Sequence, residues 1–273
     1  YSACYLFSRC ASAAAGPTVG DIRSLNKLAR KIRAVIVVLI FWPLLTASLR
    51  LVGMPDAAYR NNSDKSSQRG QVIFLAEARK PKQVNTKGSL VDYESQKIKQ
   101  TVMSTTVSEL YAFMKCFGTC QFLRGLWMDM TGLAVEIHMR TDANNLVTTA
   151  STTHLPEQRE TIHMINQLRT EACSGRIDDL AHVVSEDCLA DPLTKNSAKP
   201  DALIKAVTTG WLPNVDKHPP FRELMRNRHK AYMTLEEWII HNIPAAGDVK
   251  CFLGIPVECE IKRCLALTDW YSL

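Results

Sequence analysis

The chain has 273 residues, of which 46% are hydrophobic, and its formal net charge is +6. This length allows one large domain or a medium-sized domain with extensions, and the hydrophobic fraction excludes a wholly disordered chain. The mild positive charge is compatible with a polyanionic partner, although charge alone does not establish one.

The nine cysteines form no C-x-x-C pair. This spacing predicts reduced cysteines that mostly pack in an intracellular protein, and no zinc site. The most apolar stretch, Ala34–Leu45, is too short to span a bilayer and is interrupted by Pro43. It therefore predicts a buried β-strand and no membrane contact.

Residues 17–33 have the spacing of an amphipathic helix with one apolar and one basic face. The basic face includes Lys27, Arg30 and Lys31. Such a face is either a solvated surface or a surface that binds phosphates, and the sequence leaves both alternatives open.

Three strands are predicted next, at 49–56, 71–78 and 89–98. A long helix is predicted next, which begins within 103–113 and ends at Gly132. It has roughly 25 residues, each rising about 1.5 Å along the helix axis. Thr106 and Glu109 have the T-x-x-E spacing of a capping box. One face of this helix carries an apolar stripe: Leu110, Phe113, Phe117, Cys120, Leu123, Trp127 and Met130.

The remaining elements are a strand at 135–142, a short helix at 143–150, a helix at 160–173, a strand at 177–184 and a helix at 189–208. The order β-β-β-α-β-α-α-β-α predicts an α/β fold, a five-stranded mixed sheet flanked by helices. The helix at 17–33 would be an N-terminal extension. Prolines interrupt the pattern after residue 211, which predicts a partly irregular C-terminal tail with a basic helix around 221–232.

Four acidic residues occupy the ends of predicted strands or the starts of predicted helices: Asp56, Glu109, Asp142 and Asp191. Each has a purely structural interpretation, as a turn residue, a capping-box residue or an N-cap. Strand ends and the following helix starts converge at one edge of such a sheet, however. Clustered carboxylates repel one another unless a divalent cation lies between them, and oxygen ligands suit Mg²⁺ or Mn²⁺.

Several strings resemble the type 1 ribonuclease H domain of copia-type (Pseudoviridae) retrotransposon polyproteins. SELYA (108–112) is similar to the family's glutamate segment, and RTDANNL (140–146) to its third-acid segment. LADPLTK (189–195) resembles the A-D-x-L-T-K ending, KQTVMSTTVSELYA (99–112) the K-Q-x-T-V-x-x-S-T-x-E-A-E-Y stretch, and ETIHMINQLRTE (160–171) the T-K-H-I…R-E helix.

The resemblance implies metal-dependent hydrolysis of the RNA strand of RNA–DNA hybrids during reverse transcription. Asp56, Glu109, Asp142 and Asp191 would be the catalytic ligands of two Mg²⁺ or Mn²⁺ ions. The protein would recognise the hybrid through backbone shape and 2′-hydroxyl groups. His163 and His182 are candidates for an assisting histidine.

The resemblance also implies a domain organisation. Residues 1–46 would end the connection to an adjacent reverse-transcriptase domain, 47–210 would form the ribonuclease H-like domain, and 211–273 would be an extension. The location would be intracellular, in a cytoplasmic virus-like particle or in the nucleus. No Y-x-D-D polymerase motif occurs in the chain.

The chain departs from the family at Pro55, which would remove a ladder hydrogen bond from a central strand. Three alternatives remain. The chain could be an inactive remnant that binds nucleic acid or only folds, an integrase- or transposase-like nuclease, or a structural fragment whose acids serve as caps. Integrase-like sites carry three acids with the glutamate last, whereas Glu109 is second in this chain.

Overall fold

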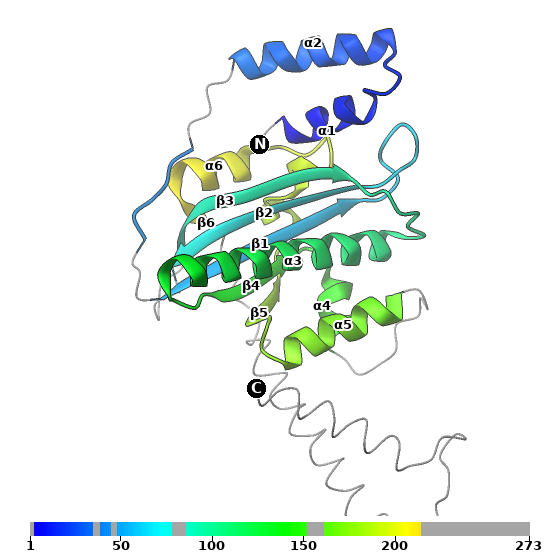
Figure 1. Cartoon of the computed structure of the whole chain (residues 1–273). Coiled ribbons are helices and arrows are strands. Elements are labelled where there is room, and N and C mark those ends of the chain that lie inside the picture. Colours follow the sequence, from blue (N-terminus) through cyan, green and yellow to red (C-terminus); the bar gives the residue numbers. More distant parts are fainter. Residues whose placement is uncertain (1–2, 35–38, 45–47, 78–85, 152–160, 214–273) are drawn as a thin grey trace, which may run out of the picture. The chain divides into compact units, whose positions relative to one another are not determined.

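The computed structural model describes residues 3–34, 39–44, 48–77, 86–151 and 161–213 (Figure 1). All of them belong to one compact unit, Tyr1–Arg226. The basic helix predicted around 221–232 lies outside the described residues. Within the described ranges, no helix combines the length and apolar character that a membrane span requires.

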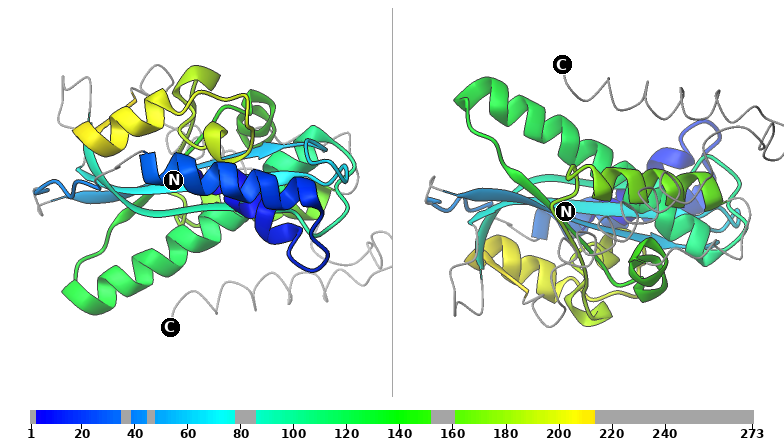
Figure 2. Two further views of the ribbon diagram at one scale, coloured as in Figure 1. Left: turned by 90° about the horizontal axis from the view of Figure 1, so that it is seen from above. Right: turned by 90° about the horizontal axis from the view of Figure 1, so that it is seen from below.

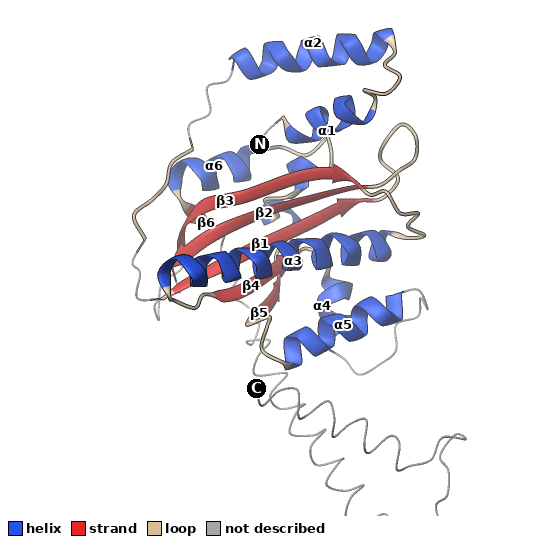
Figure 3. Cartoon of the chain, viewed as in Figure 1, coloured by secondary structure: helices blue, strands red, loops and turns tan. Residues whose placement is uncertain are grey.

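The centre of the fold is a six-stranded sheet in the order β5-β4-β1-β2-β3-β6 (Figure 3). β1 pairs antiparallel with β2 and parallel with β4, which makes the sheet mixed, as predicted. The sixth strand was not predicted: its two residues pair with the start of β3. The strands are β1 (Leu49–Ala58), β2 (Gln68–Glu77), β3 (Thr86–Lys97), β4 (Glu136–Thr141), β5 (Asp179–His182) and β6 (Trp211–Leu212).

The long helix α3 (Thr105–Thr131) is confirmed and ends at Gly132, which has a φ of 70°. Its N-cap is Ser104, whose hydroxyl accepts the N–H of Val107. The predicted capping box at Thr106 and Glu109 is therefore wrong, because the helix already begins at the earlier serine. Glu109 lies inside the helix and is not needed to cap it.

Two cores lie on opposite faces of the sheet. Helices α3, α4 (Asn144–Ser151) and α5 (Ile162–Cys173) supply the first core. The short 3-10 helix η3 (Asp191–Leu193) and α6 (Asp201–Thr209) supply the second. Figure 2 shows α3 and α6 on opposite sides of the strands. In the apolar stripe of α3, Phe113 and Phe117 are buried, whereas Met130 near the C-terminal end of the helix is 72% exposed.

The single helix predicted at 189–208 is wrong. The chain forms η3, leaves helical geometry and starts α6 only after Pro200. A proline disfavours helical geometry in the residue before it, so the segment cannot run through Pro200 as one helix.

The buried strand predicted at 34–45 is also wrong where the structure describes it. Ala34 ends helix α2, residues 39–44 have no regular secondary structure, and Phe41 is exposed. The N–H of Trp42 donates to the Ser89 hydroxyl at 2.9 Å. Pro43 has no backbone N–H and therefore cannot donate a hydrogen bond to a neighbouring strand.

Two N-terminal helices precede the sheet, α1 (Cys4–Ser12) and α2 (Val19–Ala34). α1, which was not predicted, packs against β3, η3 and α2. α2 begins with a capping pair: the Thr18 N–H donates to Asp21 at 2.8 Å, and the Asp21 N–H donates back to the Thr18 hydroxyl. On its apolar face Leu28 is buried, but Ile22 and Leu25 are exposed.

Candidate metal centre and its cavity

The parallel pairing of β1 with β4 places Asp56 and Asp142 beside each other at the same end of the two strands. Leu51 is opposite Ile137 and Gly53 is opposite Met139, where the parallel pairing ends. The same offset continued along both strands brings Asp56 opposite Asp142. Asp56 is only 1% exposed, so burial and strand register together fix its position.

Pro55 does not disturb this arrangement. It is in register with Gln71 of β2, but β4 no longer pairs with β1 at this level. Proline is tolerated where a strand lacks a partner on one side. The departure from the family string therefore leaves Asp56 at the end of a regular strand.

η3 and Thr194, the residue that follows it, pack against the same end of β1 and β2. A Cβ atom on Gly70 would lie 2.8 Å from the Leu193 Cβ, so glycine is what allows this segment to approach β2 so closely. The Asn61 amide donates to the Thr194 carbonyl at 2.6 Å. The Thr194 hydroxyl donates to the Asp56 carboxylate and thereby holds its orientation.

A thiol completes the inner cluster. Carboxylate oxygens of Asp56 and Asp142 and the sulfur of Cys188 lie within 4.8 Å of one another. Cys188 is 3% exposed, and burial raises the pKa of its thiol well above its usual value. The three residues offer ligand atoms close enough for one metal ion.

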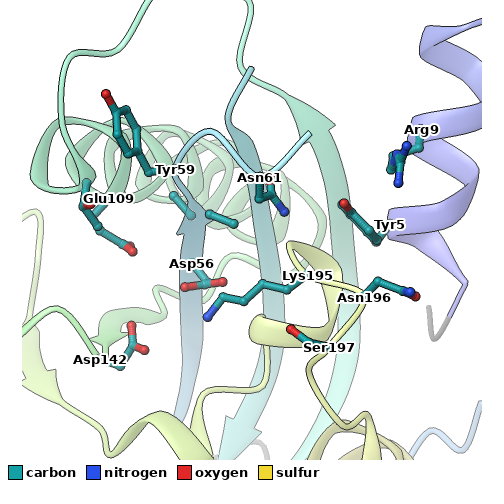
Figure 4. Close-up of a pocket in the computed structure, with 13 residues that line it drawn as sticks. Tyr5, Arg9, Asp56, Tyr59, Asn61, Glu109, Asp142, Lys195, Asn196 and Ser197 are labelled. Atoms are coloured by element: carbon teal, nitrogen blue, oxygen red, sulfur yellow. The ribbon is translucent and has the colours of Figure 1, made fainter. Parts of the chain in front are cut away.

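A cavity of about 770 Å³ opens beside this cluster (Figure 4). Asp56, Glu109 and Asp142 line it together with Lys195. Asp191 does not line the cavity; its carboxylate pairs with the Lys195 ammonium group instead. The other lining residues are Tyr5, Arg9, Ala57, Ala58, Tyr59, Asn61, Thr105, Asn196 and Ser197.

Burial and mutual repulsion raise the pKa values of two of these carboxyl groups. Burial raises the pKa of Glu109 to about 9, and the negative charges of Asp56 and Asp142 contribute. Burial also raises the pKa of Asp56 to about 6, against the opposing effects of Lys195 and of the Thr194 hydrogen bond. A bound cation would relieve both effects, and the oxygen-rich donor set fits a hard divalent ion.

The capping interpretations of the other acids do not hold. η3 has Ala190 at its N-cap and shows no side-chain capping hydrogen bond, so Asp191 is not a cap. α4 begins at Asn144, so Ala143 and not Asp142 occupies the position directly before the helix.

The remaining candidates lie outside the cavity lining. The His182 ring contacts the backbone carbonyl of Asp142 at 3.1 Å, and His163 is exposed on α5. Lys27 and Arg30 are exposed on α2. Lys31 lies in the same helix.

The sequence did not predict the other residues that line the cavity, nor Thr194 and Cys188 beside it. Thr194 and Lys195 belong to the LADPLTK string, so their closeness to Asp191 was a usable signal. Cys188 was interpreted as a packing residue. Tyr5 and Arg9 precede every motif, and no local pattern pointed to them.

No family model and no curated protein matches the chain. Solved structures with a similar fold include LC11-RNase H1, which was isolated from compost and whose structure was solved in complex with an RNA/DNA hybrid. It is 19% identical, with a TM-score of 0.38, and the match covers 56% of this chain and 99% of that chain. The N-terminal ribonuclease H domain of a Mycobacterium tuberculosis protein is 16% identical, with a TM-score of 0.38 and coverage of 59% and 99%. Ribonuclease H1 of Halobacterium salinarum is 21% identical, with a TM-score of 0.35 and coverage of 56% and 97%.

Proposed function

We propose that this chain is a divalent-metal-dependent ribonuclease that cleaves the RNA strand of RNA–DNA hybrids. The observation that carries the proposal is the convergence of Asp56, Glu109 and Asp142 on one cavity. These acids come from a strand, a helix and the end of a second strand. Glu109 and Asp142 also lie in the resembling strings SELYA and RTDANNL, and no capping role explains either of them.

In this proposal Asp56, Glu109 and Asp142 hold Mg²⁺ or Mn²⁺, and Asp191 joins them when it separates from Lys195. Bound divalent ions would activate the attacking water and stabilise the leaving 3′ oxygen. The protein's own contribution is orientation. The Thr194 hydroxyl fixes the Asp56 carboxylate, and the Ala57 N–H donates to Glu109.

The retrotransposon origin is part of the same proposal. The exposed apolar residues of α2 would contact an adjacent reverse-transcriptase domain, and residues 1–46 would connect the two domains. Its basic residues Lys27, Arg30 and Lys31 would add affinity for the hybrid. In this proposal α1, which packs against β3, would be the part of the connection that is joined to the ribonuclease domain.

An inactive remnant that still folds is the main alternative. One experiment on the purified chain distinguishes an active ribonuclease from an inactive remnant. An RNA strand labelled at one end is annealed to DNA and incubated with Mg²⁺, with Mn²⁺ or with a chelator. The proposal predicts internal cleavage of the hybrid RNA with either metal and none with the chelator. Single-stranded RNA and duplex DNA should remain intact.

A further inference from the structure

Helix α1 is anchored at the mouth of the acidic cavity. Tyr5 is 5% exposed, and the Gln68 amide of β2 donates to the Ser8 hydroxyl at 2.9 Å. α1 also packs against β3 and η3. The helix is therefore held to the catalytic face of the domain.

Two residues of α1, Tyr5 and Arg9, reach the cavity lining. Figure 4 shows them across the cavity from Glu109 and Asp142. Among the described residues, none forms an ion pair with Arg9, which is exposed near the C-terminal end of α1. The Asp21 carboxylate of α2 acts on it electrostatically but does not come within ion-pair distance. The Arg9 guanidinium group can therefore bind a ligand that enters the cavity.

The cavity has two chemically different sides. One side carries the carboxylates of Asp56, Glu109 and Asp142. The other carries hydrogen-bond donors and a cation, from Arg9, Tyr5, Asn196 and Ser197, with Lys195 lying between the sides (Figure 4). The acidic side needs cations, whereas the donor side suits an anion.

A guanidinium group binds phosphate oxygens through two parallel hydrogen bonds, and hydroxyl and amide groups position nucleic-acid backbones in the same way. A nucleic acid placed with one phosphate at the acidic side presents neighbouring phosphates along its strand. One of these can reach donors on the opposite side of the same cavity.

We propose that α1 is part of the substrate-binding groove, and that Arg9 with Tyr5 binds a backbone phosphate adjacent to the one at the metal centre. This inference rests on the proposed function for the identity of the substrate. The phosphate contact itself does not depend on cleavage. Binding and catalysis can therefore fail separately.

The test measures binding of a fluorescently labelled RNA–DNA hybrid by anisotropy, without divalent ions, over a range of salt concentrations. Arg9→Gln should weaken binding on the order of tenfold and reduce the salt dependence by about one released counterion. Arg9→Lys should recover part of the affinity. Tyr5→Phe, which keeps the buried ring, should weaken binding by about threefold through loss of one hydrogen bond.

The matched control is Lys205→Gln. It removes the same charge from an exposed position of α6 and lies outside the cavity lining. Mn²⁺ affinity measured by calorimetry should be the same in wild type and Arg9→Gln, since Arg9 faces the donor side. Hybrid binding of Arg9→Gln that matches Lys205→Gln would overturn the inference. Arg9-dependent binding without any cleavage by wild type would support the inference and refute the ribonuclease.

Discussion

The ammonium group of Lys195 pairs with the carboxylate of Asp191, four residues earlier in the chain. It also lines the cavity that contains Asp56 and Asp142, and their negative charges act on it. Burial alone would lower the pKa of Lys195, but these carboxylates raise it. Lys195 is thus an internal counter-charge for the acidic cluster.

Replacing this counter-charge should have opposite effects on stability and on metal binding. Lys195→Met should lower the melting temperature in chelator, because the carboxylates lose their cation. It should also tighten Mn²⁺ binding by a factor on the order of ten, since a competing positive charge is gone. Lys195→Arg is the control and should behave like wild type in both measurements. Weaker Mn²⁺ binding by Lys195→Met would contradict this role.

The acids themselves should be needed for chemistry and not for folding. Asp56→Asn, Glu109→Gln and Asp142→Asn should each abolish hybrid cleavage while circular dichroism shows a retained fold. Asp191→Asn should leave residual activity, because Asp191 lies outside the cavity lining. Asp129→Asn, at the exposed far end of α3, is the control and should cleave normally. Retained cleavage in Asp56→Asn would remove Asp56 from the proposed ligand set.

The raised pKa values predict how stability depends on pH without metal. Burial raises the pKa of Asp56 to about 6 and that of Glu109 to about 9, above the usual values of 3.8 and 4.5. The folded protein therefore holds more protons than the unfolded chain between these limits. Its free energy of unfolding should fall as pH rises from about 4 to about 9.

The measurement is a series of thermal melts in chelator at pH 5 to 9, repeated with Mg²⁺. The decline of the melting temperature should be smaller in an Asp56→Asn, Glu109→Gln double variant. Stabilisation by Mg²⁺ should grow with pH, because protons compete with the ion for the same oxygens. A wild-type melting temperature that rises with pH in chelator would show that folding does not raise the pKa values of these carboxyl groups.

The close approach of η3 to β2 can be tested at Gly70. Gly70→Ala places a Cβ 2.8 Å from the Leu193 Cβ and 2.9 Å from the Thr194 methyl group. It should destabilise the fold by about 1–3 kcal/mol and weaken metal binding, because the Thr194 contact with Asp56 shifts. Gly118→Ala on α3 meets no atom within 4 Å and should stabilise by about 0.5–1 kcal/mol. Equal effects of the two substitutions on metal affinity would contradict this packing argument.

The basic face of α2 gives a separate prediction. Charge reversal at Lys27, Arg30 and Lys31 together should weaken hybrid binding, most strongly at low salt, without changing the metal dependence of cleavage. Unchanged affinity at low salt would identify this face as a solvated surface. Reversal at Arg124 is not a suitable control, because Arg124 donates to the backbone carbonyl of Arg176.

The sequence predicted the sheet and the long helix well because these depend on local periodicity. Alternating residues such as Ile137 and Met139 in β4, and the buried steps from Leu110 to Cys120 in α3, mark their faces directly. The sequence was weaker where a single residue decides at which position a helix begins. Ser104 rather than Thr106 caps α3, and Pro200 rather than Asp191 precedes the last α-helix.

Glu109 and Asp142 were predictable because they belong to recognisable strings, and Asp56 because it ends a predicted strand. Their neighbours depended on long-range packing. Thr194 reaches Asp56 across 138 positions of the chain, through a segment whose approach requires Gly70. Tyr5 and Arg9 reach the cavity only because α1 packs on β3, which no local pattern in α1 indicates.

The most direct test of the ribonuclease proposal compares wild type with Glu109→Gln on one end-labelled RNA–DNA hybrid, at increasing Mg²⁺ or Mn²⁺. Glu109 is the informative position because its substitution leaves the N-cap of α3 at Ser104 untouched. The proposal predicts metal-dependent internal cleavage of the RNA strand by wild type, and none by a folded Glu109→Gln protein that still binds hybrid. Folded wild-type protein that binds the hybrid and leaves the RNA intact at every metal concentration would contradict the proposal.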